Sequence, residues 1–487
     1  MAVEKVSYLT AKIFFSHPIM YVFEGLGTNT PFDVREYCLI FKDDMCEEWV
    51  DTEATREYTL KLIRIEKEKP GYFENLINSY EWRKEKFLNL VDELDRSDLA
   101  KKNDEELIAM LNTFMRVYVD QFCLPAITFM YADHMSNILL KKFSEKHENA
   151  SELLSAVTNP SIEMFSNAER RELLELMCRM IEKFGNGLFK LPEEKIETKI
   201  KKDKLYEELV KHSMKYFWID NNYRRAVVLG PFDFIRKMKD ESLSFEHPKD
   251  ELEEIKKIKE EAESKRKKYG GMLGDEEKTM AYLLSRGAEF QDERKKCNLI
   301  GDHIIQKFAD EISRRSGITK ELVANAKFDE IFGLLDGSIT AEELEKRGKE
   351  FHTMYYKNEG NKTEIGFKKG RMHEIKEVKK PEMFTGTPAS MGIAKGKVRL
   401  ILSDHDFKKM GKGNILVSGM TRPDFVPVMK KAAAIVTDEG GLTCHAAVVS
   451  RELGVPCVVG TRIATAVLED GDLIEVDGKK GTVKISK

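Results

Sequence analysis

Apolar residues recur at helical spacing from about residue 50 to residue 350 of this 487-residue chain. Segments such as DEELIAMLNTFMRVYVDQF and ERRELLELMCRMIEKF repeat apolar side chains three and four positions apart, with little of the alternation typical of strands. Helix starts are indicated where Asn103 precedes a run of helix formers and where Thr340 lies three residues before Glu343. The pattern predicts a mostly α-helical region over residues 1–359.

The pattern changes near the C-terminal end of the sequence. The β-branched runs GKVRLIL, NILVSGM, AAAIVTDE, PCVVG and DLIEVDGKKGTVKI predict strands, and the Asp477-Gly478 turn predicts a hairpin. A helix is expected before Gly454, which with Pro456 ends the run AAVVSREL. The Lys-rich segment 360–384 contains Pro381 and predicts a linker or hinge. We therefore expect a multidomain chain with a compact C-terminal α/β domain of the β/β/α kind over residues 385–487.

Charge and cysteine usage exclude several classes of protein. Lys and Arg total 80 and Asp and Glu total 84, so the net charge is only -4 and predicts no binding to nucleic acid or to an anionic membrane. The seven scattered cysteines form no CxxC pair, which argues against a disulfide framework and a zinc ribbon. There is no signal-peptide pattern and no run of 18 apolar residues. A cytoplasmic, non-membrane protein is the expectation.

The stretch TDEGGLTCHAAVVSRELGVP, residues 437–456, carries the most specific chemistry. A strand, the Gly440-Gly441 turn and a helix follow one another, which brings His445 into the first helical turn. Free backbone N–H groups and the helix dipole favour a phosphate there, and Thr443 can cap the helix or donate its hydroxyl to a phosphate oxygen. Imidazole attacks phosphorus near neutral pH, so His445 is a candidate phosphoryl carrier.

Other interpretations of His445 compete with this one. A zinc site needs three or four ligands, and only Cys444 and Cys457 lie nearby in the sequence, so no metal ligands are predicted. A nucleophilic pair of Cys444 and His445 is disfavoured because neighbouring residues on a helix point to different sides. From the residues alone, an ordinary histidine at a helix end and a phosphoryl carrier remain equally open.

Residues 421–461, TRPDFVPVMKKAAAIVTDEGGLTCHAAVVSRELGVPCVVGT, resemble the phosphohistidine swivelling domain of phosphoenolpyruvate synthase, pyruvate phosphate dikinase and their relatives. The resemblance is closest to the synthase branch, which uses Thr-Cys-His. It implies that His445 becomes phosphorylated and that Thr443, Gly440, Gly441 and Arg451 support it. Glu439 departs from the family pattern, since an anion beside a phosphorylated imidazole is unfavourable unless it points away.

The helical region has a more diffuse resemblance. Residues 283–351 are similar to helices that precede the swivelling domain in rifampicin phosphotransferase-like proteins, which implies that the helical domain binds an acceptor. Within residues 211–234, Trp218, Tyr223, Arg224 and Arg225 are candidate acceptor-binding residues. Aromatic residues at helical spacing more often form a core, but an aromatic pocket rimmed by Arg would suit an organic acceptor and a phosphate.

The resemblance also sets an expectation for the donor. The synthases have an ATP-grasp domain before the swivelling domain and a TIM barrel after it. This sequence lacks the glycine-rich phosphate loops expected of an ATP-grasp domain. It ends at Lys487, so no TIM barrel is expected after the swivelling domain. We therefore expect a phosphotransferase component. An ATP-grasp or phosphoenolpyruvate-binding partner chain, holding Mg²⁺ with ATP or phosphoenolpyruvate, charges His445, and a small-molecule acceptor bound by the helical domain receives the phosphoryl group. The alternative is a regulatory or scaffold protein in which phosphorylation of His445 controls a partner interaction without onward transfer.

Overall fold

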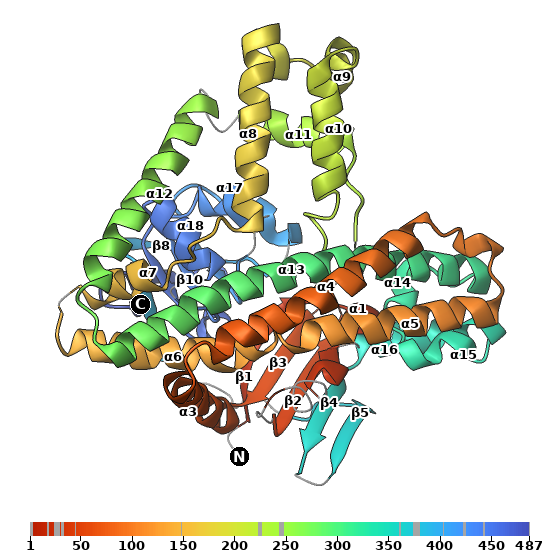
Figure 1. Ribbon diagram of the computed structural model, residues 1–487, viewed down its shortest axis with the longest axis horizontal. Coiled ribbons are helices and arrows are strands. Elements are labelled where there is room, and N and C mark those ends of the chain that lie inside the picture. Colours follow the sequence, from red (N-terminus) through yellow and green to blue (C-terminus); the bar gives the residue numbers. More distant parts are fainter. Residues whose placement is uncertain are drawn as a thin grey trace.

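The computed structural model describes residues 3–16, 19–23, 30, 34–43, 45–147, 149–222, 226–242, 248–359, 362–373, 380–402, 404–421, 425–441 and 444–486. A bundle of long helices occupies the middle of the molecule (Figure 1). A small sheet lies on one side of the bundle, and the C-terminal sheet domain, drawn in blue, lies on the other. The predicted combination of a mostly helical region and a C-terminal α/β domain is confirmed.

The helices begin and end where the local sequence indicates. Asn103 and Glu106 form a reciprocal capping box at the start of α5, and Thr340 and Glu343 form another at the start of α16. The helices of this region are α1 (Ile13–Ser16), α3 (Thr52–Glu68), α4 (Tyr72–Arg96), α5 (Asp104–Cys123), α6 (Ile127–Ser144), α7 (Ala150–Thr158), α8 (Phe165–Phe184), α9 (Glu193–Ile200), α10 (Lys204–Tyr216), α11 (Pro231–Ser242), α12 (Pro248–Gly270), α13 (Asp275–Ser316), α14 (Lys320–Val323), α15 (Ile331–Asp336) and α16 (Ala341–Lys349). Short 3₁₀ turns cover Leu99–Lys101, Leu188–Lys190 and Phe328–Glu330.

Helix α13 organises the helical region. Its 42 residues span about 63 Å at 1.5 Å per residue, and it packs against α4, α6 and α7 (Figure 1). Its first half buries Leu283 and Phe290 in one apolar cluster, and its second half buries Ile304 and Phe308 in another. Because one helix belongs to both clusters, it holds the two parts of the helical region together.

The small sheet was not predicted. Among the described residues it has five antiparallel strands in the order β1 (Val3–Thr10), β3 (Met45–Asp51), β2 (Glu36–Lys42), β4 (His352–Asn358), β5 (Thr363–Lys369). It lies partly in the range 1–359, which was expected to be mostly α-helical, and β5 lies in the range 360–384, for which a linker was expected. Pairing of β2 with β4 joins segments about 300 residues apart, which no local pattern reveals. The domain boundaries themselves stay a prediction.

The C-terminal domain contains the predicted strands. An eight-stranded sheet has the order β6 (Met383–Thr385), β13 (Thr482–Ser486), β12 (Leu473–Asp477), β8 (Ile393–Leu400), β9 (Ile415–Ser418), β10 (Ala434–Thr437), β11 (Cys457–Val459), β7 (Thr387–Ser390) within the described residues. Helices α17 (Val426–Met429), α18 (His445–Glu452) and α19 (Ala464–Val467) and a 3₁₀ segment at Asp404–Lys409 connect the strands. Strands β8 to β11 are parallel, and every residue of β9, β10 and β11 is buried, as their continuous apolar runs require. The predicted hairpin joins β12 and β13.

Across the described ranges, no helix combines the length and the apolar character needed to cross a bilayer.

Asp302 of α13 has an environment that predicts an unusual stability profile. The side chain is fully buried, and neither of its carboxylate oxygens has a hydrogen-bond partner in the described part of the chain. Burial raises the pKa of Asp302 well above its ordinary value. The folded protein therefore keeps a proton on Asp302 that the unfolded chain releases. The contribution of protonated Asp302 to the free energy of unfolding is fully present below the unfolded pKa, and it is lost as the pH rises towards the folded pKa.

We expect Asp302→Asn to increase the free energy of unfolding at pH 8 by about 1 kcal/mol or more, and to increase it less at pH 5. Urea unfolding at the two pH values measures both effects. Asp310→Asn, which removes a part-exposed carboxylate of α13 that pairs with Lys320 of α14, is the control and should change little. An Asp302→Asn protein no more stable than the wild type at pH 8 would contradict this interpretation.

Candidate functional site

His445 is the first residue of α18, where the sequence predicted it. Cys444 is the N-cap, and its Sγ accepts a hydrogen bond from the backbone N–H of Ala447 at 3.4 Å. The imidazole is half-buried. It therefore lies at the end of the helix where the backbone N–H groups and the helix dipole favour negative charge.

A hydrogen bond with Thr421 holds one side of the imidazole ring. The Nδ1 atom of His445 lies 2.8 Å from Oγ1 of Thr421, a residue that is only 6% exposed and follows β9. When Nδ1–H donates to this hydroxyl oxygen, the lone pair of the neutral ring is on Nε2. This tautomer makes Nε2 the nucleophilic nitrogen.

The glycine turn before α18 depends on residues without a side chain. Gly440 has φ +99°, and a Cβ there would come within 2.5 Å of Sγ of Cys444. Gly460, with φ +68°, approaches so closely that its Cβ would lie 2.9 Å from the carbonyl oxygen of Gly440. The loops that follow β10 and β11 are thus packed backbone against backbone beside the start of α18.

Asp438 holds the second of these loops in place. Its carboxylate accepts hydrogen bonds from the Thr461 hydroxyl at 3.1 Å and from the Thr465 backbone N–H at 3.2 Å. Its carbonyl accepts the backbone N–H of Arg462 at 2.9 Å, and Arg462 has the left-handed φ of +64°. A non-glycine residue in this region costs about 1 kcal/mol or more, so the network offsets a strained backbone that fixes the position of Arg462.

Two charged residues of the helical region face the glycine turn. A Cβ on Gly441 would lie 3.5 Å from Oδ1 of Asp133 in α6, so this carboxylate is adjacent to the turn. Burial raises the pKa of the Cys444 thiol to about 11, and Asp133 contributes to the increase. Lys295 of α13 interacts electrostatically with the same thiol. Cys444 consequently stays a thiol near neutral pH, and the site contains a carboxylate and an ammonium group from the helical region.

The other predicted support residues have different outcomes. Gly440 and Gly441 lie in the turn that leads to His445, and Thr443 lies outside the described residues. Arg451 is six residues after His445, about 9 Å further along the helix axis, and its Nη1 donates to the carbonyl oxygen of Ala389 in β7 at 3.2 Å. In this conformation Arg451 joins α18 to the sheet, and contact with a phosphate on His445 stays a prediction.

The predicted acceptor-binding group receives no support from the position of Trp218. Its side chain is 2% exposed and packs edge-on against Phe165, with ring centroids 5.4 Å apart. A tryptophan in this environment is part of the apolar core, the alternative that aromatic spacing also allowed. Tyr223, Arg224 and Arg225 lie outside the described residues.

Glu439, which departs from the family pattern, is anchored through its backbone. Its N–H donates to the carbonyl oxygen of Gly419 at 2.9 Å. The pKa of Cys46 in β3 is raised chiefly by burial, with a small contribution from Glu439. The carboxylate is therefore close enough to the small sheet to interact with it.

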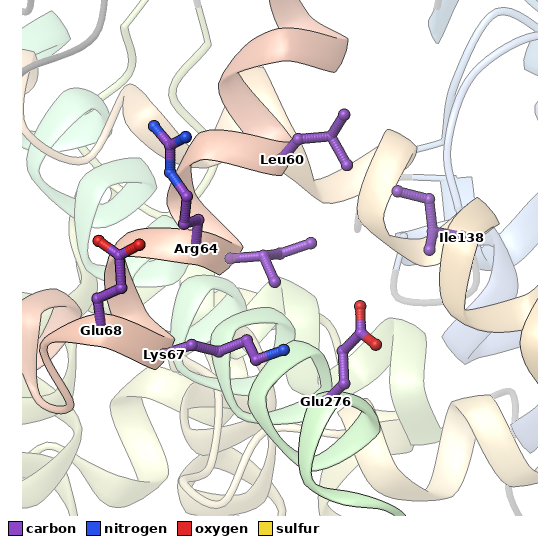
Figure 2. Close-up of a pocket in the computed structure, with 7 residues that line it drawn as sticks. Leu60, Arg64, Lys67, Glu68, Ile138 and Glu276 are labelled. Atoms are coloured by element: carbon purple, nitrogen blue, oxygen red, sulfur yellow. The ribbon is translucent and has the colours of Figure 1, made fainter.

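A separate cavity of about 390 Å³ lies between α3, α6 and α13. Figure 2 shows the charged side chains of Arg64, Lys67, Glu68 and Glu276 around it. Leu60, Ile63 and Ile138 supply its apolar lining. Ile138 is five residues after Asp133, about 140° around α6, so the cavity opens on a different face of that helix from the one next to Gly441. In the described part of the chain, no cluster of three or more His, Cys, Asp or Glu side chains suits a metal ion.

Comparison with known proteins characterises the domain that carries His445. Residues 410–481 match the family described as PEP-utilising enzyme, mobile domain. The C-terminal domain is therefore similar to the mobile domain of this family, and we call it the mobile domain. A probable phosphoenolpyruvate synthase from Archaeoglobus fulgidus is 62% identical over 101 residues, which are 21% of this chain and 13% of the relative. Phosphoenolpyruvate synthase from Pyrococcus furiosus is 54% identical over 111 residues, 23% of this chain and 14% of the relative.

A third relative comes from a bacterium. The uncharacterized phosphotransferase YvkC of Bacillus subtilis is 45% identical over 100 residues, 20% of this chain and 12% of the relative. The chain thus aligns with only about an eighth of the length of these curated relatives. The similarity identifies the mobile domain and leaves the activity of the whole protein to be proposed from the site.

Sequence reasoning missed four residues of this site. Thr421 and Asp438 lie within the stretch that resembles the swivelling domain, so a closer reading of that stretch could have singled them out. Asp133 and Lys295 precede His445 by more than 300 and by 150 residues, and neither belongs to a recognisable motif. Only the packing of the mobile domain against α6 and α13 brings them to the glycine turn.

The geometry of the turn predicts that Gly440→Ala destabilises the mobile domain by about 3 kcal/mol, because an unfavourable φ is combined with a clash against Cys444. Gly454→Ala is a matched control: its φ is +64° and its Cβ would meet nothing within 4 Å, so only the backbone cost of about 1 kcal/mol is expected. Thermal unfolding of the two variants measures the difference. Equal destabilisation would show that the contact with Cys444 is unimportant.

Proposed function

We propose that this protein is a phosphotransferase in which His445 carries a phosphoryl group from a donor on a partner chain to an acceptor bound by the helical region. The observation that carries the proposal is the His445 imidazole at the N-terminal end of α18 with Nδ1 bonded to Thr421. The names of the relatives, phosphoenolpyruvate synthase and phosphotransferase, agree with phosphoryl transfer.

In the charging step, the Nε2 lone pair attacks the phosphorus of the donor. The new N–P bond forms as the donor's bond to phosphorus breaks, and the leaving oxygen keeps that electron pair. The ring becomes cationic while Nδ1–H still donates to Thr421. The backbone N–H groups at the start of α18 stabilise the charge of the transferred group.

We assign the donor site to an ATP-grasp or phosphoenolpyruvate-binding partner. Mg²⁺, which neutralises phosphate charge when it is bound with ATP or phosphoenolpyruvate, prefers carboxylate oxygens. This chain contributes the nucleophile and the hydrogen bonds that orient it.

In the transfer step, the glycine turn lies against α6 and α13, as in this structure. Lys295 is exposed on α13 near Cys444, so its ammonium group can reduce the negative charge of a phosphoryl group on His445. Attack by an acceptor oxygen then breaks the N–P bond and returns the electron pair to Nε2.

Helix α13 also supports an acceptor site in the helical region. Asn221 donates through Nδ2 to the carbonyl oxygen of Leu299 at 2.8 Å, and Phe217 packs edge-on against His303 with centroids 5.0 Å apart. The segment proposed from sequence to bind the acceptor thus lies against α13, and Leu299 is one helical turn after Lys295. We infer that a small molecule with a hydroxyl or carboxylate group binds along this part of α13.

The direct test incubates the protein with a co-purified partner and labelled ATP or labelled phosphoenolpyruvate. We expect acid-labile, base-stable label on the wild-type chain and none on His445→Ala, because a phosphoryl group on imidazole nitrogen hydrolyses in acid. If the partner is shown to be active and the wild-type chain takes no label from either donor, the proposed function is wrong.

Thr421→Val should slow the appearance of label about fivefold, since the loss of one hydrogen bond worth about 1 kcal/mol leaves the ring tautomer and orientation unfixed. Rapid-quench measurement of the first turnover gives this rate. Thr421→Ser keeps the hydroxyl and should label at close to the wild-type rate. Equal labelling rates for the Val and Ser variants would show that this hydrogen bond does not contribute to the phosphorylation of His445.

A further inference from the structure

Asp133 occupies a fixed position beside the site. It belongs to α6, whose neighbouring residues Tyr131 and Met135 are fully buried, so the backbone that carries it is held by core packing. The side chain itself is exposed, and its Oδ1 lies 3.5 Å from the point where a Cβ of Gly441 would be. A carboxylate on a rigid helix therefore meets the turn that presents His445.

The charged and titratable groups around Asp133 come from several elements. Arg462 faces it from the turn after β11, and Cys444 from the start of α18. Lys295 approaches the same thiol from α13. On α6, His134 is the next residue, and burial together with Arg56 of α3 lowers the pKa of this histidine. Arg462 is thus the cationic group that acts on this carboxylate, while Lys295 acts on Cys444 and Arg56 acts on His134.

This environment suits a proton acceptor. The surrounding protein partly desolvates Asp133 and raises its pKa, although the side chain keeps contact with water, and the positive charge of Arg462 opposes the increase. A carboxylate with a raised pKa is a stronger base that still ionises in water. The mechanism described so far uses no group to accept the proton of an attacking hydroxyl.

We propose that Asp133 is the general base of the transfer step and removes the proton from an acceptor hydroxyl group as its oxygen attacks the phosphorus on His445. The O–P bond forms, the N–P bond breaks with its electron pair returning to Nε2, and the hydroxyl proton moves to the Asp133 carboxylate. The assignment rests on the proposed function and extends it, because it selects a hydroxyl-bearing acceptor over a carboxylate, which has no proton to give at neutral pH.

The alternative is that Asp133 only pairs with Arg462 and stabilises the packed arrangement of the two domains. In that case its replacement would change stability and leave the pH dependence of transfer unaltered. A base has a different signature: its contribution to the rate increases with pH as the carboxyl group loses its proton, and then becomes constant.

The experiment uses the full-length chain, phosphorylated chemically with phosphoramidate, with water as the probe acceptor. Loss of the phosphoryl group from His445 is followed between pH 6 and pH 9 by phosphorus-31 nuclear magnetic resonance. We expect Asp133→Asn to take up the group as the wild type does and to lose it about 100-fold more slowly at pH 8. The difference between the two rates should decrease as the pH falls through the pKa of Asp133, and Asp133→Glu should recover part of the rate.

Glu276→Gln is the matched control, since Glu276 is an exposed carboxylate of the helical region that lines the separate cavity. It should lose the phosphoryl group at the wild-type rate. If Asp133→Asn keeps the wild-type rate and pH profile, Asp133 is not the base and this inference is overturned while the carrier role of His445 stands. If His445→Ala retains the same phosphorus signal as the wild type, the group is not on His445, and the proposed function is overturned together with this inference.

Discussion

The hydrogen bond between Thr421 and Nδ1 of His445 is the interaction on which the site depends. An imidazole has two nitrogens, and either could carry a phosphoryl group if the ring were free to turn. Nδ1 lies 2.8 Å from the hydroxyl of a buried threonine, and when Nδ1–H donates to that oxygen the lone pair is on Nε2. The start of α18, the glycine turn and the loop fixed by Asp438 then form a rigid frame around a ring that has one defined orientation.

The surroundings of that ring come from both parts of the chain. The mobile domain supplies the nucleophile and the backbone N–H groups, and the helical region supplies Asp133 and Lys295 from two helices packed in its core. One apolar cluster extends from the helices into the mobile domain, where it includes Phe425 and Ala446. The mobile domain is thus packed against the helical region in this structure.

The sequence predicted the parts of the molecule whose signals are local. The strands β8 to β13, the helix that begins at His445 and the capping boxes at Asn103 and Thr340 all follow from short patterns. The small sheet does not, because β2 and β4 become neighbours only after the intervening helices fold. The local pattern around Trp218 is likewise insufficient, because its spacing fits both a pocket and a core. The burial of its side chain in the structure shows that it belongs to the core. Asp133 belongs to no sequence motif, and only its position next to Gly441 in the folded chain indicates that it is part of the site.

The most direct test of this account identifies the nitrogen that carries phosphate. The wild-type chain would be charged by its partner with ATP or phosphoenolpyruvate, kept at alkaline pH, and studied by phosphorus-31 and nitrogen-15 nuclear magnetic resonance. We expect one N–P bond, located on Nε2 of His445, with Nδ1 still protonated and bonded to Thr421. A phosphoryl group on Nδ1, or on any residue other than His445, would contradict this expectation.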